Sequence, residues 1–159
     1  MKRFVVTGCN GYIGSHMCYE LKKAYPDCVI HGIDKNEKQH LRSLYDIFTH
    51  CDLAMDPFDL SPFKHQPIDA IFHFAAYISV EEGEMRPFEY YHNNVVGSMR
   101  LIRAALSYGV PNFIFSSTAA VYGERKDCLF GHLNENLPKN AFSVYGKTKQ
   151  MVEEVLSGV

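Results

Sequence analysis

The chain reads Arg3-Phe4-Val5-Val6-Thr7-Gly8-Cys9-Asn10-Gly11-Tyr12-Ile13-Gly14 near its N-terminus. Residues 3–7 are rich in β-branched and aromatic side chains and predict a strand, whereas the apolar positions of residues 12–24 recur near the helical period. The glycines between them permit a tight turn, and the N-terminus of the following helix supplies N–H donors and a partial positive charge. This arrangement predicts a dinucleotide pyrophosphate site, and the competing interpretation is a glycine turn without a ligand. The three glycines are Gly8, Gly11 and Gly14.

A second predicted strand, residues 28–33, delivers Asp34 at its C-terminal end. A carboxylate at this place can accept hydrogen bonds from the adenosine ribose hydroxyls and would repel a 2′-phosphate, which favours NAD over NADP. Lys35 beside it keeps NADP as an alternative. A surface aspartate that merely ends a strand is the other alternative.

The rest of the chain continues the alternation of strands and helices. We expect a polar helix over 37–48, a short strand near 51–53, an apolar central strand over 70–76, a long helix over 87–108, a strand over 112–116 and a last helix over 142–156. This order predicts an α/β fold, a doubly wound parallel sheet of the Rossmann type, forming one domain over residues 1–159. Ligands of such a sheet gather beyond the carboxyl ends of its strands.

Tyr145 and Lys149 are four residues apart on the last predicted helix and therefore share a face. A neighbouring ammonium favours the phenolate, so this tyrosine could take a proton from a sugar hydroxyl. The same spacing occurs at Tyr19…Lys23 and Tyr122…Lys126. We favour Tyr145 because it follows a hydroxyl cluster, residues 116–118, just past a predicted strand. An ordinary amphipathic helix face and a strand-end turn are the alternatives for these two features.

Composition narrows the classes of function. Sixteen basic and eighteen acidic residues give a net charge of -2, which argues against a nucleic-acid partner. Five cysteines without a CxxC pair and eight scattered histidines predict no metal site, and the thiols are expected to be reduced, in a cytoplasmic protein. The sequence predicts no secretory signal and no membrane span. His73 is expected to be a core residue, and residues 81–84 a solvated loop and helix start.

Taken together, these segments resemble the N-terminal, cofactor-binding part of the extended short-chain dehydrogenase/reductase family, and within it the 4-epimerases of UDP-hexoses. The resemblance extends along the whole sequence. It is carried by residues 7–14, 34, 51–53, 73–76, 89–95, 115–123 and 145–149.

The resemblance implies the following NAD site. Gly8, Gly11 and Gly14 would bind the pyrophosphate, with Tyr12 and Ile13 beside it. Asp34 would hold the adenosine ribose, and Asp52 and Leu53 the adenine. The remaining cofactor contacts would come from Phe74, Ala75, Ala76, Asn94, Ser116, Tyr145 and Lys149.

The resemblance also implies the catalytic groups. Tyr145 would be the base, Lys149 would bind the nicotinamide ribose and tune the tyrosine, and Thr118 would hydrogen-bond the sugar 4-hydroxyl. Related dehydratases place an Asp-Glu pair where this chain has Ala119-Ala120, so we expect an NAD-dependent nucleotide-sugar 4-epimerase or its cofactor-binding fragment. The alternatives are a non-catalytic NAD-binding module and another nucleotide-sugar epimerase or reductase of the family.

Some features depart from the family pattern. Ile78 stands where many of these epimerases have a lysine, Val144 replaces the usual proline before the tyrosine, and the loop over 123–145 is slightly long. We also expect the family's C-terminal substrate domain to be absent, which would leave the strand over 112–116 at a sheet edge. By analogy with the family, a homodimer would form through the two C-terminal helices, residues 87–108 and 142–156.

Overall fold

The computed structural model describes residues 1–57, 60, 63, 66–123 and 133–159. Cys128 therefore lies outside the described residues. The chain divides into two compact units: unit 1 comprises Met1–Ala76 and Arg100–Ser116, and unit 2 comprises Tyr77–Met99 and Ser117–Val159. Within the described ranges, no helix combines the length and the apolar character that crossing a membrane requires.

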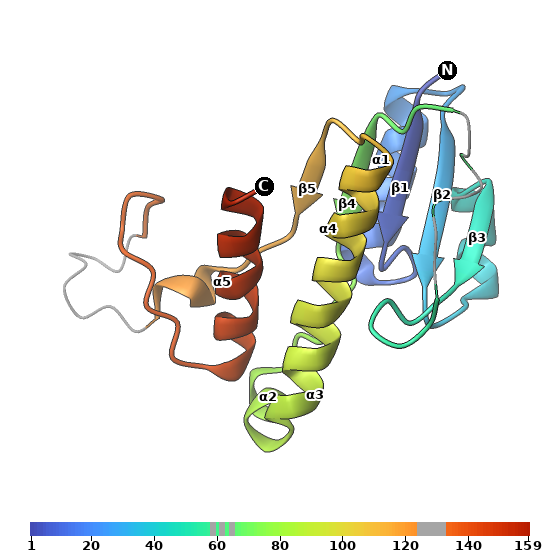
Figure 1. Cartoon of the computed structure of the whole chain (residues 1–159). Coiled ribbons are helices and arrows are strands. Elements are labelled where there is room, and N and C mark those ends of the chain that lie inside the picture. Colours follow the sequence, from blue (N-terminus) through green and yellow to red (C-terminus); the bar gives the residue numbers. More distant parts are fainter. Residues whose placement is uncertain (58–59, 61–62, 64–65, 124–132) are drawn as a thin grey trace. The chain divides into compact units, whose positions relative to one another are not determined.

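Unit 1 contains a five-stranded parallel sheet (Figure 1). Its strands are β1 (Arg3–Thr7), β2 (Val29–Asp34), β3 (Ile47–His50), β4 (Ala70–His73) and β5 (Phe113–Phe115), in the order β3-β2-β1-β4-β5. The chain adds strands on one side of β1 and then crosses to the other side, so the strand order reverses next to β1. The predicted fold class is confirmed. The prediction that residues 70–76 form the central strand is wrong, because this crossover places β1 in the centre.

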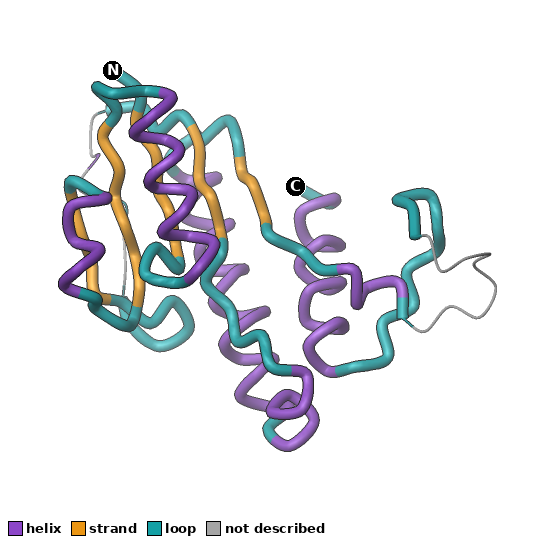
Figure 2. Tube along the Cα trace, turned by 180° about the vertical axis from the view of Figure 1, so that it is seen from behind, coloured by secondary structure: helices purple, strands orange, loops and turns teal. Residues whose placement is uncertain are grey.

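Helices cover both faces of this sheet (Figure 2). Alternate residues of β1 point to opposite faces, as the period of a strand requires. Phe4 and Val6 pack with the buried residues of α1 (Tyr12–Ala24), whereas Val5 packs with Leu101 and Ala105 of α4 (Gly97–Ser107). The sheet is thus buried on both sides, which is typical of parallel sheets.

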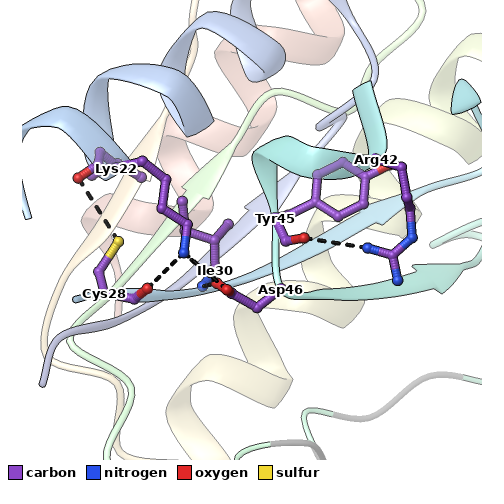
Figure 3. A network of polar contacts seen from close by, with 7 residues as sticks. Lys22, Cys28, Ile30, Arg42, Tyr45 and Asp46 are labelled. Atoms are coloured by element: carbon purple, nitrogen blue, oxygen red, sulfur yellow. Dashed lines mark hydrogen bonds and ion pairs between the residues drawn. The ribbon is translucent and has the colours of Figure 1, made fainter. Parts of the chain in front are cut away.

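The predicted polar helix over 37–48 and the strand near 51–53 are wrong. The structure has a short 3-10 helix, η1 (Gln39–Leu44), followed by β3, and residues 51–53 follow that strand. Asp46 explains why β3 begins within the range predicted to be helical (Figure 3). Its carboxylate accepts a hydrogen bond from the Ile30 N–H at 2.7 Å and forms an ion pair with the Lys22 ammonium at 2.7 Å. These contacts hold the start of β3 beside β2, where residues 47–50 pair with residues 31–34.

Four cysteines lie in the described part of unit 1, and all four are free and buried. Cys9, Cys18 and Cys28 belong to the cluster on the α1 side of the sheet, and Cys51 belongs to the cluster on the α4 side. Burial raises the pKa of Cys18 to about 12 and that of Cys51 to about 11. These thiols are therefore protonated at neutral pH.

Unit 2 is helical. It contains α2 (Val80–Met85), α3 (Pro87–Tyr90), the π-helix η3 (Tyr91–Val96), the first residues of α4, the 3-10 helix η4 (Ala119–Tyr122) and α5 (Val144–Ser157). The predicted helix over 87–108 is therefore three consecutive helical segments, and its middle turn is π-helical. A single π turn inside a longer helix frequently marks a functional region.

Candidate functional site

The glycine turn of unit 1 has a backbone that only glycines fit. Gly8 has a φ of 69°, in the left-handed region, and its amide donates to the carbonyl of Ile33 at 2.8 Å. A Cβ on Gly14 would lie 2.1 Å from the Gly8 oxygen, and one on Gly8 would lie 2.7 Å from the Ala75 nitrogen. Glycine at these two positions lets the turn close on itself and lets residues 74–75 pack against it. A glycine turn that leads into a helix N-terminus suits an anionic ligand.

Asp34 is anchored beside this turn. Its carboxylate accepts the N–H of Asn10, in the glycine turn, and the N–H of Asn36, each at 2.9 Å. Asn10 in turn donates its side-chain amide to the Asn36 carbonyl at 2.7 Å and accepts from the Tyr45 hydroxyl at 3.1 Å. A carboxylate has about four acceptor positions, so Asp34 retains capacity for ribose hydroxyls.

The loop after β3 carries Asp52 and Leu53. Asp52 accepts the N–H of Ala54 at 2.9 Å, and its carboxylate lies 4.0 Å from the Lys35 ammonium. The Leu53 side chain is buried in the core, so a contact with adenine would come from its backbone. Arg100 holds this loop by donating to the Leu53 carbonyl at 2.8 Å and to the Asp56 carbonyl at 2.6 Å. Sequence reasoning missed Arg100, because carbonyl partners leave no signal in side-chain patterns.

Two further residues sit at the carboxyl ends of strands. His73 is buried and its Nδ1 lies 2.6 Å from the Thr7 hydroxyl, as expected for a core histidine. The Ser116 amide donates to the His73 carbonyl at 3.1 Å, which places this predicted cofactor residue directly after β5 and beside the end of β4.

In unit 2, α5 carries Tyr145 and Lys149 one turn apart. Tyr145 is half-buried, whereas Lys149 is 3% exposed. Burial lowers the pKa of Lys149 to about 8, because desolvation disfavours its charged form. Perturbed pKa values of this kind cluster at functional sites.

Thr118 belongs to the same unit and caps η4. Its hydroxyl oxygen accepts the N–H of Ala120 at 3.2 Å, so its proton remains available to donate. A Cβ on Gly146 of α5 would lie 2.8 Å from the Ala120 carbonyl oxygen. The segment that Thr118 begins therefore packs directly on the first turn of α5, and unit 2 contains all three predicted catalytic residues.

Asn94, in the π-helix, is buried and its side-chain amide is fully used. Its oxygen accepts from the Tyr77 amide and from the Asn93 side chain, both at 2.8 Å. Its nitrogen donates to the Tyr77 carbonyl at 3.0 Å and to the Thr148 hydroxyl at 3.1 Å. An asparagine side chain makes about four hydrogen bonds, so Asn94 anchors α5 and residue 77 with its whole capacity.

Unit 1 thus presents a glycine turn between β1 and α1 with an anchored aspartate beside it, and unit 2 a tyrosine and a buried lysine on one helix. The chain belongs to the NAD dependent epimerase/dehydratase family, whose profile matches residues 4–158. It is similar to the UDP-glucose 4-epimerase of Bacillus subtilis, with 37% identity over 160 residues that cover 96% of this chain and 46% of that protein.

Solved structures agree with this assignment. The UDP-Glc/GlcNAc 4-epimerase from Campylobacter jejuni matches with a TM-score of 0.87 and 34% identity, covering 99% of this chain and 49% of that one. The UDP-glucose-4-epimerase from Stenotrophomonas maltophila, with bound NAD and formylated UDP-arabinopyranose, matches with a TM-score of 0.87 and 32% identity, covering 99% and 48%. This chain therefore spans about half the length of these relatives.

Proposed function

We propose that this chain provides the NAD-binding and proton-transfer part of a nucleotide-sugar 4-epimerase that acts on UDP-hexoses. The observation that carries the proposal is the arrangement in unit 2, where Lys149 is buried one turn from Tyr145 and the segment of Thr118 packs on the same helix. The names of the relatives, and the UDP sugar bound to one of them, support this substrate class.

NAD would be held by the groups of unit 1 already described. The backbone of the glycine turn would receive the pyrophosphate beside the exposed Tyr12 and Ile13, and Asp34 would accept from the adenosine ribose. When bound, NAD supplies a hydride acceptor that is regenerated in each cycle. The protein's own contribution is to bind, orient and move a proton.

Tyr145 would take the proton of the sugar 4-hydroxyl, and the Thr118 hydroxyl would donate a hydrogen bond to the same sugar oxygen while keeping its own proton. Lys149 would hold the nicotinamide ribose and favour the ionised form of the tyrosine. Return of the proton from Tyr145 to the sugar completes the cycle without net consumption of acid or base.

A homodimer would use the apolar side chains that α4 and α5 leave exposed. Met99 and Leu106 on α4 are 47% and 58% exposed, and Met151 on α5 is 43% exposed. Met99 and Leu106 are seven residues apart and therefore share one face of α4, and exposed apolar side chains on one face mark a surface that can pair with another subunit.

The test is to incubate the purified 159-residue chain with NAD and UDP-galactose and to measure UDP-glucose, with Tyr145→Phe as the control. NAD binding is measured separately by calorimetry. Turnover that Tyr145→Phe abolishes would establish the epimerase. NAD binding without turnover would leave a cofactor-binding part whose chemistry needs further protein, and would keep the non-catalytic NAD-binding module as the alternative. Absence of NAD binding would refute the proposal.

A further inference from the structure

The first turn of α5 has an amide that the helix itself cannot satisfy. Ser143 caps the helix by accepting the N–H of Gly146 at 3.0 Å. Val144 is the first helical residue, and the N–H at this position has no partner within a helix. In this chain the carboxylate of Glu84, on α2, accepts it at 2.7 Å.

The backbone of α2 lies against this turn. A Cβ on Gly83 would be 3.3 Å from the Tyr90 ring of α3 and 3.6 Å from the Tyr145 nitrogen, so the backbone of α2 runs within a side chain's reach of the first turn of α5. Glu84 follows immediately and reaches the residue directly before Tyr145. Of the other described acids on α2 and α3, Glu82 and Glu89 both pair with Arg86, and Glu81 is exposed.

We propose that Glu84 is a positioning residue for Tyr145, which it holds by binding the Val144 amide and tethering the first turn of α5 to α2. The inference rests on the proposed function of Tyr145. A carboxylate at a helix N-terminus binds the amide and also interacts favourably with the helix dipole. Glu84 thereby fixes the backbone from which the tyrosine side chain projects.

This assignment predicts that a proline at position 144 makes Glu84 dispensable. Proline is favoured at the first helical position because it has no N–H to satisfy and its φ suits the helix. The residue before a proline must be extended, and Ser143 already has φ −74° and ψ 150°. Val144→Pro is therefore compatible with the present backbone and removes the group that Glu84 binds.

The experiment compares Glu84→Ala, Val144→Pro and the double variant, with Glu81→Ala as the matched control because Glu81 is an exposed acid on the same helix. Calorimetry gives the Kd values for NAD and AMP at a temperature at which circular dichroism shows every variant folded. Only NAD contains the nicotinamide ribose that Tyr145 and Lys149 would contact. General damage to folding would weaken the binding of NAD and AMP alike. It would not produce a loss of affinity that is confined to NAD and that Val144→Pro restores.

We expect Glu84→Ala to weaken NAD binding about fivefold, if the stability that one capping interaction gives the first turn of α5 is passed in full to the bound state, and to leave AMP binding unchanged. The double variant should bind NAD as Val144→Pro does. The inference would be overturned if Glu84→Ala bound NAD as tightly as Glu81→Ala does. It would also be overturned if the double variant bound NAD as weakly as Glu84→Ala does. If the unmodified chain does not bind NAD, the proposed function fails. In that case, amide hydrogen exchange tests separately whether Glu84 holds the first turn of α5. If the exchange rates of this turn are unchanged in Glu84→Ala, the positioning role of Glu84 is refuted.

Discussion

Replacing Lys149 by methionine should stabilise the folded chain at neutral pH, even though the lysine is a proposed catalytic group. The side chain is 3% exposed, and burial lowers its pKa from 10.5 to about 8. One pKa unit corresponds to about 1.4 kcal/mol, so burying the ammonium costs about 3 kcal/mol at pH 7. Methionine keeps a long apolar stem and removes this cost.

The sign follows from the protons bound in each state. Below pH 8 both the folded and the unfolded chain carry the proton, and the full cost is present. Between pH 8 and 10.5 only the unfolded chain carries it, so the stability of the unmodified protein rises with pH across this range. The advantage of Lys149→Met should therefore shrink from about 3 kcal/mol at pH 7 to about 1 kcal/mol near pH 10.

Urea unfolding followed by circular dichroism at pH 7 and pH 10 measures this difference. Lys147→Met is the matched control, because Lys147 lies on the same helix and is exposed. The reasoning is refuted if Lys149→Met is no more stable than Lys147→Met at pH 7, or if its gain is the same at both pH values.

Three other substitutions test the described contacts. Gly14→Ala would place a Cβ 2.1 Å from the Gly8 oxygen, so it should lower the free energy of unfolding by at least about 2 kcal/mol and abolish NAD binding, measured by urea unfolding and calorimetry. Arg100→Met should release the carbonyls of residues 53 and 56, and so weaken the binding of AMP and of NAD by the same factor, about tenfold. The affinity for nicotinamide mononucleotide should not change, and an equal loss for all three ligands would contradict this prediction. Asp46→Asn should flatten the loss of stability below pH 4. Burial alone would raise the pKa of Asp46, but its bonds to Lys22 and the Ile30 amide outweigh this and lower it, so the carboxylate stabilises the fold above that pH and the contribution disappears on acidification. Urea unfolding of both proteins at several pH values from 6 to 3 measures this effect. The prediction is wrong if the free energy of unfolding falls equally steeply with acidification in both proteins.

Local sequence signals predicted the elements that local chemistry determines. The first strand, the glycine turn and the first helix were predicted over 3–24 and are β1 and α1 with their turn, because glycine spacing and helical periodicity are properties of neighbouring residues. The last helix was predicted over 142–156, and α5 is Val144–Ser157. Asp34 likewise ends β2, as its place after an apolar run indicated.

The features that escaped prediction depend on partners far along the chain. β3 is a strand of four residues whose position is fixed by Asp46 and the Ile30 amide, so its short apolar run was assigned to a helix. The π-helix has no local signature and is held by Asn94 through residues 77 and 148. Glu84 and Arg100 bind backbone groups, and no spacing of side chains encodes such contacts.

The four buried thiols of unit 1 make the two faces of its sheet separately observable. An alkylating reagent attacks the thiolate, which burial suppresses here, so modification requires the surrounding core to open. Cys51 reports on the α4 face, and Cys9, Cys18 and Cys28 report on the α1 face. Peptide mapping of a timed alkylation would therefore record which face of the sheet separates first, and whether a ligand at the glycine turn slows one face more than the other.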